Sequence, residues 1–178
     1  MRKEALTPMP SPFADVTRPP PRYHLGLVVL FATLVVATSF SAKADFSGKV
    51  VGVSDGDTIT VLNGRVQVKV RLVEIDAPEK AQPFGNRSKQ ALSTLIHGQE
   101  VHVVEKLTDR YGRTLGKVYR GNLDVNAEMV RVGMAWVYRK YASKKSPLFA
   151  VEAAARQARV GLWTDKDPIA PWEWRKSK

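Results

Sequence analysis

The sequence predicts an α+β domain, a five-stranded Greek-key β-barrel with about three packed helices. Three observations lead to this prediction. Short β-branched runs recur in the region after residue 44, and the pair Asn63-Gly64 is typical of a tight hairpin. Apolar segments of helical length then interrupt and follow the strand-like runs.

Three strands are expected first. β-branched runs occupy Lys49–Val53 and Thr58–Leu62, and the hairpin signal Asn63-Gly64 follows the second run. From Val66 to Leu72, apolar and polar residues alternate, which indicates a strand with one buried face.

Helices and strands alternate in the next part of the chain. A helix is expected over Asn86–His97, with its apolar residues on one face and Gly98 as its stop. The segments Val101–Leu107 and Thr114–Tyr119 have the composition of strands, joined by a turn over 109–113. A short helix is expected over 126–132, ended by Gly133.

The last helix is expected to begin at Ser146-Pro147, with Ser146 as N-cap and Pro147 in the first turn. It would run through an Ala-rich stretch to Val160, where Gly161 supplies a left-handed stop. The remaining tail contains three tryptophans: Trp163, Trp172 and Trp174. Five strands interrupted and followed by helices favour the OB-fold, a barrel that binds oligonucleotides.

Residues 1–44 are expected to be an export signal. Six of the eleven prolines lie within residues 1–24, and residues 25–40 form an uncharged apolar run of 16 residues. Ala42-Lys43-Ala44 fits a cleavage motif, so we expect a cut after Ala44 and a single domain over residues 45–178. Two alternatives stay open: segment 25–40 remains as a membrane anchor, and Met9 is the true start.

The composition excludes several classes of protein. The 178 residues include three histidines and no cysteine. The lack of cysteine excludes a disulfide framework, a cysteine nucleophile and a thiolate zinc site. There are 28 basic and 17 acidic residues, for a formal charge of +11. Residues 1–44 hold five basic and two acidic residues, so the excess belongs to the domain and favours a polyanionic partner.

Two acidic loops together have the composition of a cation site. Asp55 and Asp57 follow the first strand, and Asp76 and Glu79 follow the third. Each pair alone is ordinary turn chemistry. Together they form an all-oxygen set that suits Ca²⁺ or Mg²⁺, with Asp55 as a candidate to support the ligands from behind.

Two arginines complete the requirements of phosphodiester hydrolysis. Arg71 lies five residues before Asp76, and Arg113 closes the turn over 109–113. The reaction needs a cation on the phosphate, a carboxylate to activate water, and guanidinium groups for the developing charge. Taken singly, Arg71 would be a salt-bridge residue and Arg113 a turn residue.

The region from Val50 to Trp163 resembles the staphylococcal nuclease (thermonuclease) family. The matching stretches occur in the family's order: Asp55-Gly56-Asp57-Thr58, Arg71-Leu72, Ile75-Asp76-Ala77-Pro78-Glu79, Asp109-Arg110-Tyr111-Gly112-Arg113, Asn126, Val130-Arg131, Gly133, Ala135 and Gly161-Leu162-Trp163. The tail Pro171–Arg175 is similar to bacterial exported members.

The resemblance implies an OB-fold and a Ca²⁺-dependent hydrolysis of DNA and RNA that leaves 3′-phosphate ends. It also implies roles for individual residues: Asp57, Asp76 and the backbone carbonyl of Ala77 as calcium ligands, Glu79 as the proposed general base, Arg71 and Arg113 as phosphate-binding residues, and Arg110 and Tyr111 as contacts to the nucleotide phosphate.

Three departures from the founding member bear on these roles. Ala77 replaces a threonine, which a backbone contact tolerates. Glu74 replaces an apolar residue, and we expect it to face solvent rather than to join the acidic cluster. The nucleotide-stacking tyrosine is left open between Tyr138 and Tyr141, either of which could instead pack in the core.

A non-catalytic OB-fold module that binds nucleic acid is the alternative function. The presence of Asp57, Arg71, Asp76, Glu79 and Arg113 together favours catalysis. We expect a monomer with no protein partner, and tryptophans that pack in the core rather than stack on bases. Candidates for contacts to backbone phosphates are Lys106, Arg110, Lys117, Arg139, Lys140, Lys144 and Lys145.

Overall fold

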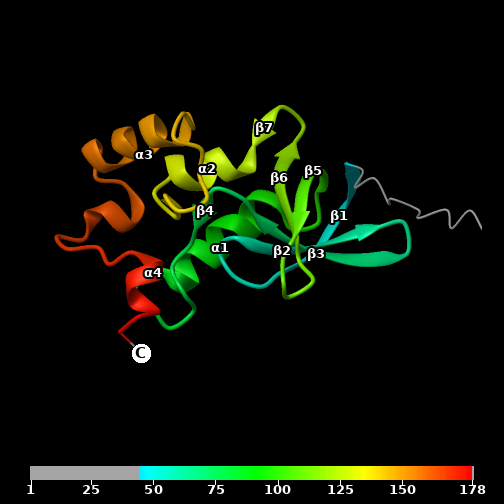
Figure 1. The fold of residues 1–178 in the computed structure, drawn as a ribbon, viewed down its shortest axis with the longest axis horizontal. Helices are drawn as coiled ribbons and strands as arrows, with labels where there is room; N and C mark the ends of the chain where they lie inside the picture. The colour runs from blue at the N-terminus through cyan, green and yellow to red at the C-terminus, as the bar shows by residue number, and fades with distance from the viewer. Residues whose placement is uncertain (1–44, 178) are drawn as a thin grey trace, which may run out of the picture. The chain divides into compact units, whose positions relative to one another are not determined.

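Five strands close into a barrel in this computed structural model, which describes residues 45–177 (Figure 1). The strands are β1 (Phe46–Val53), β2 (Thr58–Asn63), β3 (Val66–Leu72), β5 (Glu100–Thr108) and β6 (Thr114–Arg120). They are hydrogen-bonded in the order β3-β2-β1-β5-β6, and β7 (Leu123–Asp124) extends the edge. A parallel pairing of β3 with β6 closes the cylinder, which confirms the predicted barrel. The predicted signal segment lies outside the described residues.

The barrel interior is filled by β-branched and leucine side chains. Val50, Ile59, Val70, Val103 and Val118 are completely buried, each from a different strand. The alternation predicted over 66–72 holds only in its second half, because Val66 is 64% exposed. The hairpin of β2 and β3 reaches beyond the barrel there, away from the helices in Figure 1, so its tip has nothing to pack against.

Three helices of seven residues or more cover one side and end of the barrel: α1 (Gly85–Ile96), α2 (Val125–Arg131) and α3 (Leu148–Gln157). The bounds of α1 and α2 agree with the predicted helices to one residue. Asp124 caps α2, accepting a hydrogen bond of 3.0 Å from the backbone N–H of Ala127. Two short strands, β4 (Ile75–Asp76) and β8 (Trp136–Val137), pair antiparallel between the barrel and the helices.

The expected ends of the last helix are wrong. Ser146 does not cap α3; its hydroxyl donates instead to the Glu74 carboxylate at 2.9 Å. The helix ends at Gln157, three residues early, because Arg159 takes the left-handed conformation that terminates it. Gly161 is also left-handed, but it opens the 3₁₀ turn η1 (Gly161–Thr164).

The C-terminal segment packs against this helical side through aromatic residues. Trp136 lies edge-on to Trp163 and Trp172, with ring centroids 4.5 and 5.7 Å away. The expectation that these tryptophans pack in the protein is therefore confirmed for Trp136 and Trp163, which are buried. In residues 45–177, no helix has the length and apolar character needed to cross a membrane.

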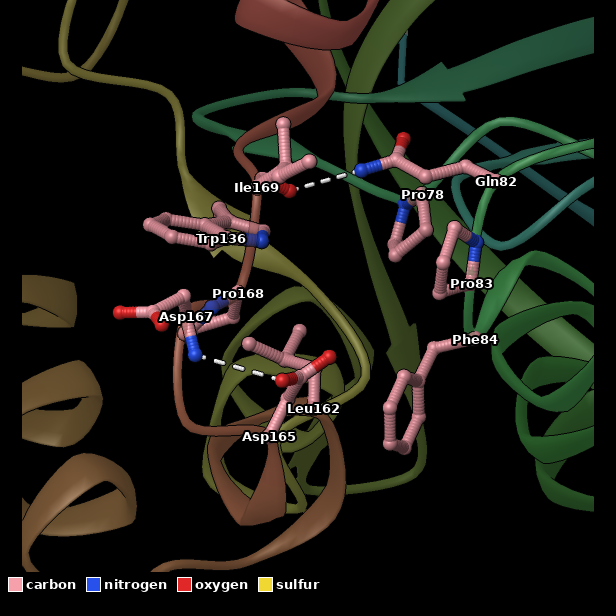
Figure 2. A pocket seen from close by; sticks show the side chains of 10 residues that line it. All are labelled: Pro78, Gln82, Pro83, Phe84, Trp136, Leu162, Asp165, Asp167, Pro168 and Ile169. Atoms are coloured by element: carbon pink, nitrogen blue, oxygen red, sulfur yellow. Dashed lines mark hydrogen bonds between the residues drawn. The ribbon is translucent and has the colours of Figure 1, made fainter.

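The last helix, α4 (Pro171–Trp174), is brought to the loop before α1 by the segment over 165–170. Gln82 in that loop donates to the carbonyl of Ile169 at 2.7 Å, as Figure 2 shows. A small cavity of about 50 Å³ lies beneath this contact, with Trp136 and Leu162 on one side and Phe84 on the other. The tail thus reaches the same end of the molecule as the acidic loop that ends at Glu79.

Candidate active site

Two buried aspartates share one arginine where strands of the barrel end. Asp57 precedes β2, Asp76 lies in β4, and Arg71 lies near the end of β3. Arg71 Nη2 is 3.2 Å from Asp57 Oδ2 and 2.8 Å from Asp76 Oδ1. The aspartates are 5% and 1% exposed, so the three charges are held largely out of water.

Backbone and hydroxyl groups fix the Asp57 carboxylate. Its Oδ1 accepts from the Thr58 hydroxyl, and its Oδ2 accepts from the backbone N–H of Ala77, both at 2.9 Å. Asp55 Oδ1 accepts from the backbone N–H of Asp57 at 3.0 Å, which orders the turn. Asp55 therefore supports the turn that carries Asp57, and its part in a cation site stays a prediction. At Gly56, an added Cβ would overlap the Ser88 hydroxyl, so only glycine lets α1 approach this turn.

The electrostatics of the pair favour an added cation. Burial raises the pKa of Asp57 to about 6, against the lowering effect of Arg71. Burial likewise raises the pKa of Asp76, and the neighbouring charge of Asp57 adds to the effect. A carboxylate whose pKa is raised in this way is stabilised when a cation binds beside it, because the cation offsets the free-energy cost of its buried charge.

The residues at this point fit a divalent cation by charge and donor type, although not as a complete cage. Asp57 and Asp76 supply hard oxygen ligands. Within residues 45–177, no group of three or more acidic or histidine side chains surrounds a common point. The other ligands of a cation here would be backbone carbonyls such as that of Ala77, water and phosphate oxygens.

Arg175, in the C-terminal tail, also reaches this cluster and was missed by the sequence analysis. Its Nη2 lies 2.6 Å from Asp76 Oδ2, and its Nη1 lies 2.6 Å from Glu79 Oε1. A third contact of 3.3 Å joins Nη1 to Asp76 Oδ1. Partial burial of Arg175 by itself lowers the pKa of its guanidinium group. The hydrogen bonds to Asp76 and Glu79 outweigh this effect, so the pKa is raised overall. The likeness of the tail Pro171–Arg175 to bacterial exported members pointed to this segment. No sequence pattern around Arg175 indicates that its side chain contacts the carboxylates.

Glu79, the predicted base, lies at the rim of the cluster. Its side chain is 43% exposed, and its carboxylate accepts from Arg175. The backbone N–H of Glu79 donates to Gln82 Oε1 at 3.1 Å, which orders the loop before α1. Glu79 is thus placed where both water and the tail can reach it.

Arg113 is held by a different carboxylate. Its Nε and Nη2 lie 2.8 and 2.7 Å from Asp109 Oδ2, and its backbone N–H also donates to Asp109. Burial by itself raises the pKa of Asp109. The hydrogen bonds from Arg113 and Tyr111 outweigh this effect, so the pKa of Asp109 is lowered overall. The parallel register of Val70 with Thr114 puts Arg113 beside the part of β3 that leads to Arg71.

An open groove lies along this part of the barrel. Lys69, Tyr111 and Arg113 line it. Tyr111 is 68% exposed, and the guanidinium groups of Arg110 and Arg113 lie 4.9 and 5.5 Å from its ring centre. The predicted substrate residues Arg110 and Tyr111 are therefore together, joined by a hydrogen bond of 2.8 Å.

The expectation for Glu74 is wrong. Its side chain is 10% exposed and contacts Lys106 and Ser146, at 3.3 and 2.9 Å. It thus neither faces solvent nor joins the Asp57–Asp76 pair. The turn at Glu74 is left-handed, with φ of 64°, which aims the side chain toward β5 and the start of α3.

The two candidate tyrosines differ in what covers them. Tyr138 stacks on Trp172 with centroids 5.5 Å apart and planes 2° apart, whereas Tyr141 is 63% exposed. Two of the basic candidates are already paired: Lys106 with Glu74, and Arg139 with Glu152 at 3.1 Å.

A small barrel with buried carboxylates and arginines at one end has the side chains of a phosphodiester hydrolase. The sequence model of the family described as "Staphylococcal nuclease homologue" matches residues 69–165. The "Micrococcal nuclease" of Shigella flexneri is 47% identical over 162 residues, covering 85% of this chain and 93% of that protein. An "Uncharacterized endonuclease" of Haemophilus influenzae is 44% identical over 154 residues, covering 85% and 86%.

Similarity extends to plants. The "Staphylococcal-like nuclease CAN1" of Arabidopsis thaliana is 37% identical over 139 residues, which cover 76% of this chain and 43% of that longer protein. The chain therefore belongs to the staphylococcal nuclease family, and its enzyme class is phosphodiester hydrolase.

Proposed function

We propose that this protein is an exported, calcium-dependent nuclease that cuts DNA and RNA with little sequence preference and leaves 3′-phosphate ends. The observation that carries the proposal is the pair of buried aspartates that share Arg71. Paired buried carboxylates are costly unless a cation compensates them, and hard oxygen ligands suit Ca²⁺. The names of the bacterial relatives, micrococcal nuclease and endonuclease, support the same reaction.

Each residue of the site has a distinct part in this proposal. When bound, calcium would polarise the phosphate and stabilise charge on its oxygens. Asp57 and Asp76, with the Ala77 carbonyl, would hold the cation. Glu79, at the exposed rim, accepts a proton from the attacking water. Arg71 donates to the phosphoryl oxygens beside the cation.

Arg113 would bind the same phosphate from the groove side. Its guanidinium is oriented by Asp109 before substrate arrives, so less conformational freedom is lost when it binds. Contacts to phosphate carry no sequence information, and Lys69, Arg113 and Tyr111 offer no base-reading pattern. We therefore propose a broad substrate range that includes both DNA and RNA.

Export is proposed from residues 1–44, with membrane anchoring by segment 25–40 as the alternative. N-terminal sequencing of the protein recovered from outside the cytoplasm tests it. A start at Asp45 supports cleavage and export. A start at Met1 or Met9 in a membrane fraction supports the anchor.

The first experiment measures cleavage of single-stranded DNA and of RNA by the full-length chain in calcium, in magnesium and in EDTA. Beside the wild type stand Glu79→Gln and Arg113→Ala. We expect calcium-dependent cleavage, and a loss of about 10³-fold or more in turnover for Arg113→Ala, by analogy with arginines on phosphoryl groups.

Arg131→Ala is the matched control for Arg113→Ala, because Arg131 is 65% exposed and, in the described part of the chain, pairs with Glu128 three residues away. It should cleave like the wild type. An active, folded Arg113→Ala protein would remove Arg113 from the site. Salt-sensitive binding of nucleic acid without cleavage in any condition would favour the non-catalytic binding module instead.

A further inference from the structure

The C-terminal tail covers the carboxylate cluster of the described structure. We propose that this tail, residues 170–177, is a tethered competitor of the divalent cation: Arg175 holds Asp76 and Glu79 in the cation-free protein and leaves them when the cation binds. The inference rests on the calcium site of the proposed function and adds its regulation. Figure 1 shows α4, in red, beside the green loop that leads into α1.

The contacts of Arg175 use the same oxygen atoms that a cation would need. Both oxygens of Asp76 are engaged by Arg175, at 2.6 and 3.3 Å, and Oδ1 is also engaged by Arg71 at 2.8 Å. Glu79 Oε1 is engaged by the other arm of the Arg175 guanidinium. One planar side chain thus bridges a predicted metal ligand and the predicted base.

Arg175 competes with a divalent ion by charge as well as by position. Asp57, Asp76 and Glu79 carry three negative charges, Asp55 adds a fourth close enough to raise the pKa of Asp57, and Arg71 and Arg175 return two positive charges. A divalent ion at Asp76 would lie close to both guanidinium groups, and this repulsion is strong where Asp57 and Asp76 are buried. If Arg175 leaves, one of the two repulsions is removed.

The tail is attached in a way that allows this exchange. Arg175 is 40% exposed, whereas Asp76 is 1% exposed, so the arginine lies between the carboxylate and solvent. Arg175 directly follows the four-residue helix α4 and is not part of a barrel strand, so it can move without breaking the barrel. The attachment is mainly aromatic, through Trp172 stacked on Tyr138 and edge-on to Trp136.

The same tail covers one of the two candidate tyrosines for base stacking. Trp172 lies parallel to Tyr138 at 5.5 Å, and the Arg175 guanidinium lies 6.0 Å from the same ring. Release of the tail would therefore expose Tyr138 and free Asp76 and Glu79 together. Cation binding and access of the nucleic acid to Tyr138 are coupled through this one segment.

Calcium titration of the full-length chain by calorimetry, without nucleic acid, tests the proposal through binding rather than activity. We expect Arg175→Ala to bind calcium about tenfold or more tightly than the wild type, because no tethered cation then competes. Trp172→Ala keeps Arg175 but removes the stacked anchor, and it should shift affinity in the same direction.

Lys176→Ala is the matched control. It removes one positive charge from the adjacent residue, but within residues 45–177 Lys176 pairs with Glu173, at 3.1 Å, and it is 72% exposed. It should bind calcium within about twofold of the wild type, since an exposed charge is screened. A shift as large as that of Arg175→Ala would show a general charge effect and overturn the proposal.

Two further outcomes separate this inference from the proposed function. If wild type and Arg175→Ala bind calcium with equal affinity, or Arg175→Ala binds more weakly, the competitor role is wrong and the calcium site stands. If none of the four proteins binds calcium, the calcium dependence itself is wrong, and the competitor role is overturned with it.

Discussion

At the scale of single residues, the site is built from charges that are unfavourable where they lie. Asp57 accepts two hydrogen bonds of 2.9 Å and faces Arg71, yet burial still raises its pKa to about 6. A residue retained in a costly state is typical of functional sites, where stability is given up for binding.

Replacement of Asp57 by asparagine should therefore stabilise the cation-free protein near neutral pH. A carboxyl with a raised pKa binds more protons in the folded state, so stability falls as pH rises from about 4 to about 6. Asp57→Asn removes that loss. We expect a gain on the order of 2 kcal/mol in unfolding free energy at pH 7 in EDTA, and none below pH 4.

Chemical denaturation at both pH values measures this difference. Asp167→Asn, an exposed aspartate in the segment after η1, is the control and should change stability little at either pH. A destabilised Asp57→Asn protein at pH 7 would mean that the ion pair with Arg71 outweighs the burial of the carboxylate.

At the scale of elements, two glycines hold the helical side together. Gly133, after α2, and Gly161, at the start of η1, face each other backbone to backbone. A Cβ added to Gly161 would lie 2.3 Å from the Gly133 carbonyl oxygen. Gly161 also has φ of 58°, so both its conformation and its space exclude other residues.

Gly161→Ala should destabilise the protein more than a left-handed conformation alone would do. The conformation costs about 1–2 kcal/mol, and the backbone overlap adds to that cost, so we expect a total above about 3 kcal/mol. Gly98→Ala is the control, because Gly98 is left-handed with φ of 75° but has no atom within 4 Å of an added Cβ. Equal losses for the two variants in denaturant titrations would contradict the packing argument.

The helix ends illustrate which local signals can be overridden. Gly98 stops α1 as its sequence position predicts. At α3, however, Arg159 adopts φ of 51° and ends the helix although a glycine lies two residues later. Gly161 instead packs against the backbone of Gly133, at the start of η1. Tertiary packing therefore decides that Arg159, and not Gly161, terminates the helix.

At the scale of the whole molecule, a formal charge of +11 and an open basic groove favour polyanions. Binding of single-stranded DNA in EDTA should weaken with salt, with a log–log slope of about −0.7 for each phosphate contact. Lys69→Ala should reduce the slope by about one contact, because Lys69 is exposed and lines the groove.

Fluorescence anisotropy at several salt concentrations measures these slopes. Lys166→Ala, in the exposed loop after η1, removes the same charge away from the groove and should leave the slope unchanged. The same slope for Lys69→Ala as for the wild type would place the bound strand elsewhere on the molecule.

Much of the site was already visible in the sequence because its parts lie on short local stretches. Arg71 and Asp76 are five residues apart, and the turn that contains Asp109 and Arg113 closes within itself. Strand and helix positions followed from periodicity, since alternation and helical spacing depend on which side chains neighbour one another along the chain. The roles of Glu79 and Arg113 stay predictions that the cleavage assay tests.

By itself, the sequence determined the barrel class, the bounds of α1, α2 and most barrel strands, the basic charge and the family motifs, because composition and local patterns along the chain carry each of them. Only the tertiary structure decided how β3 meets β6, where Glu74 points, and that Arg175 reaches Asp76 across 99 residues. Such contacts depend on how aromatic and glycine packing folds distant segments together, and no local pattern encodes that outcome.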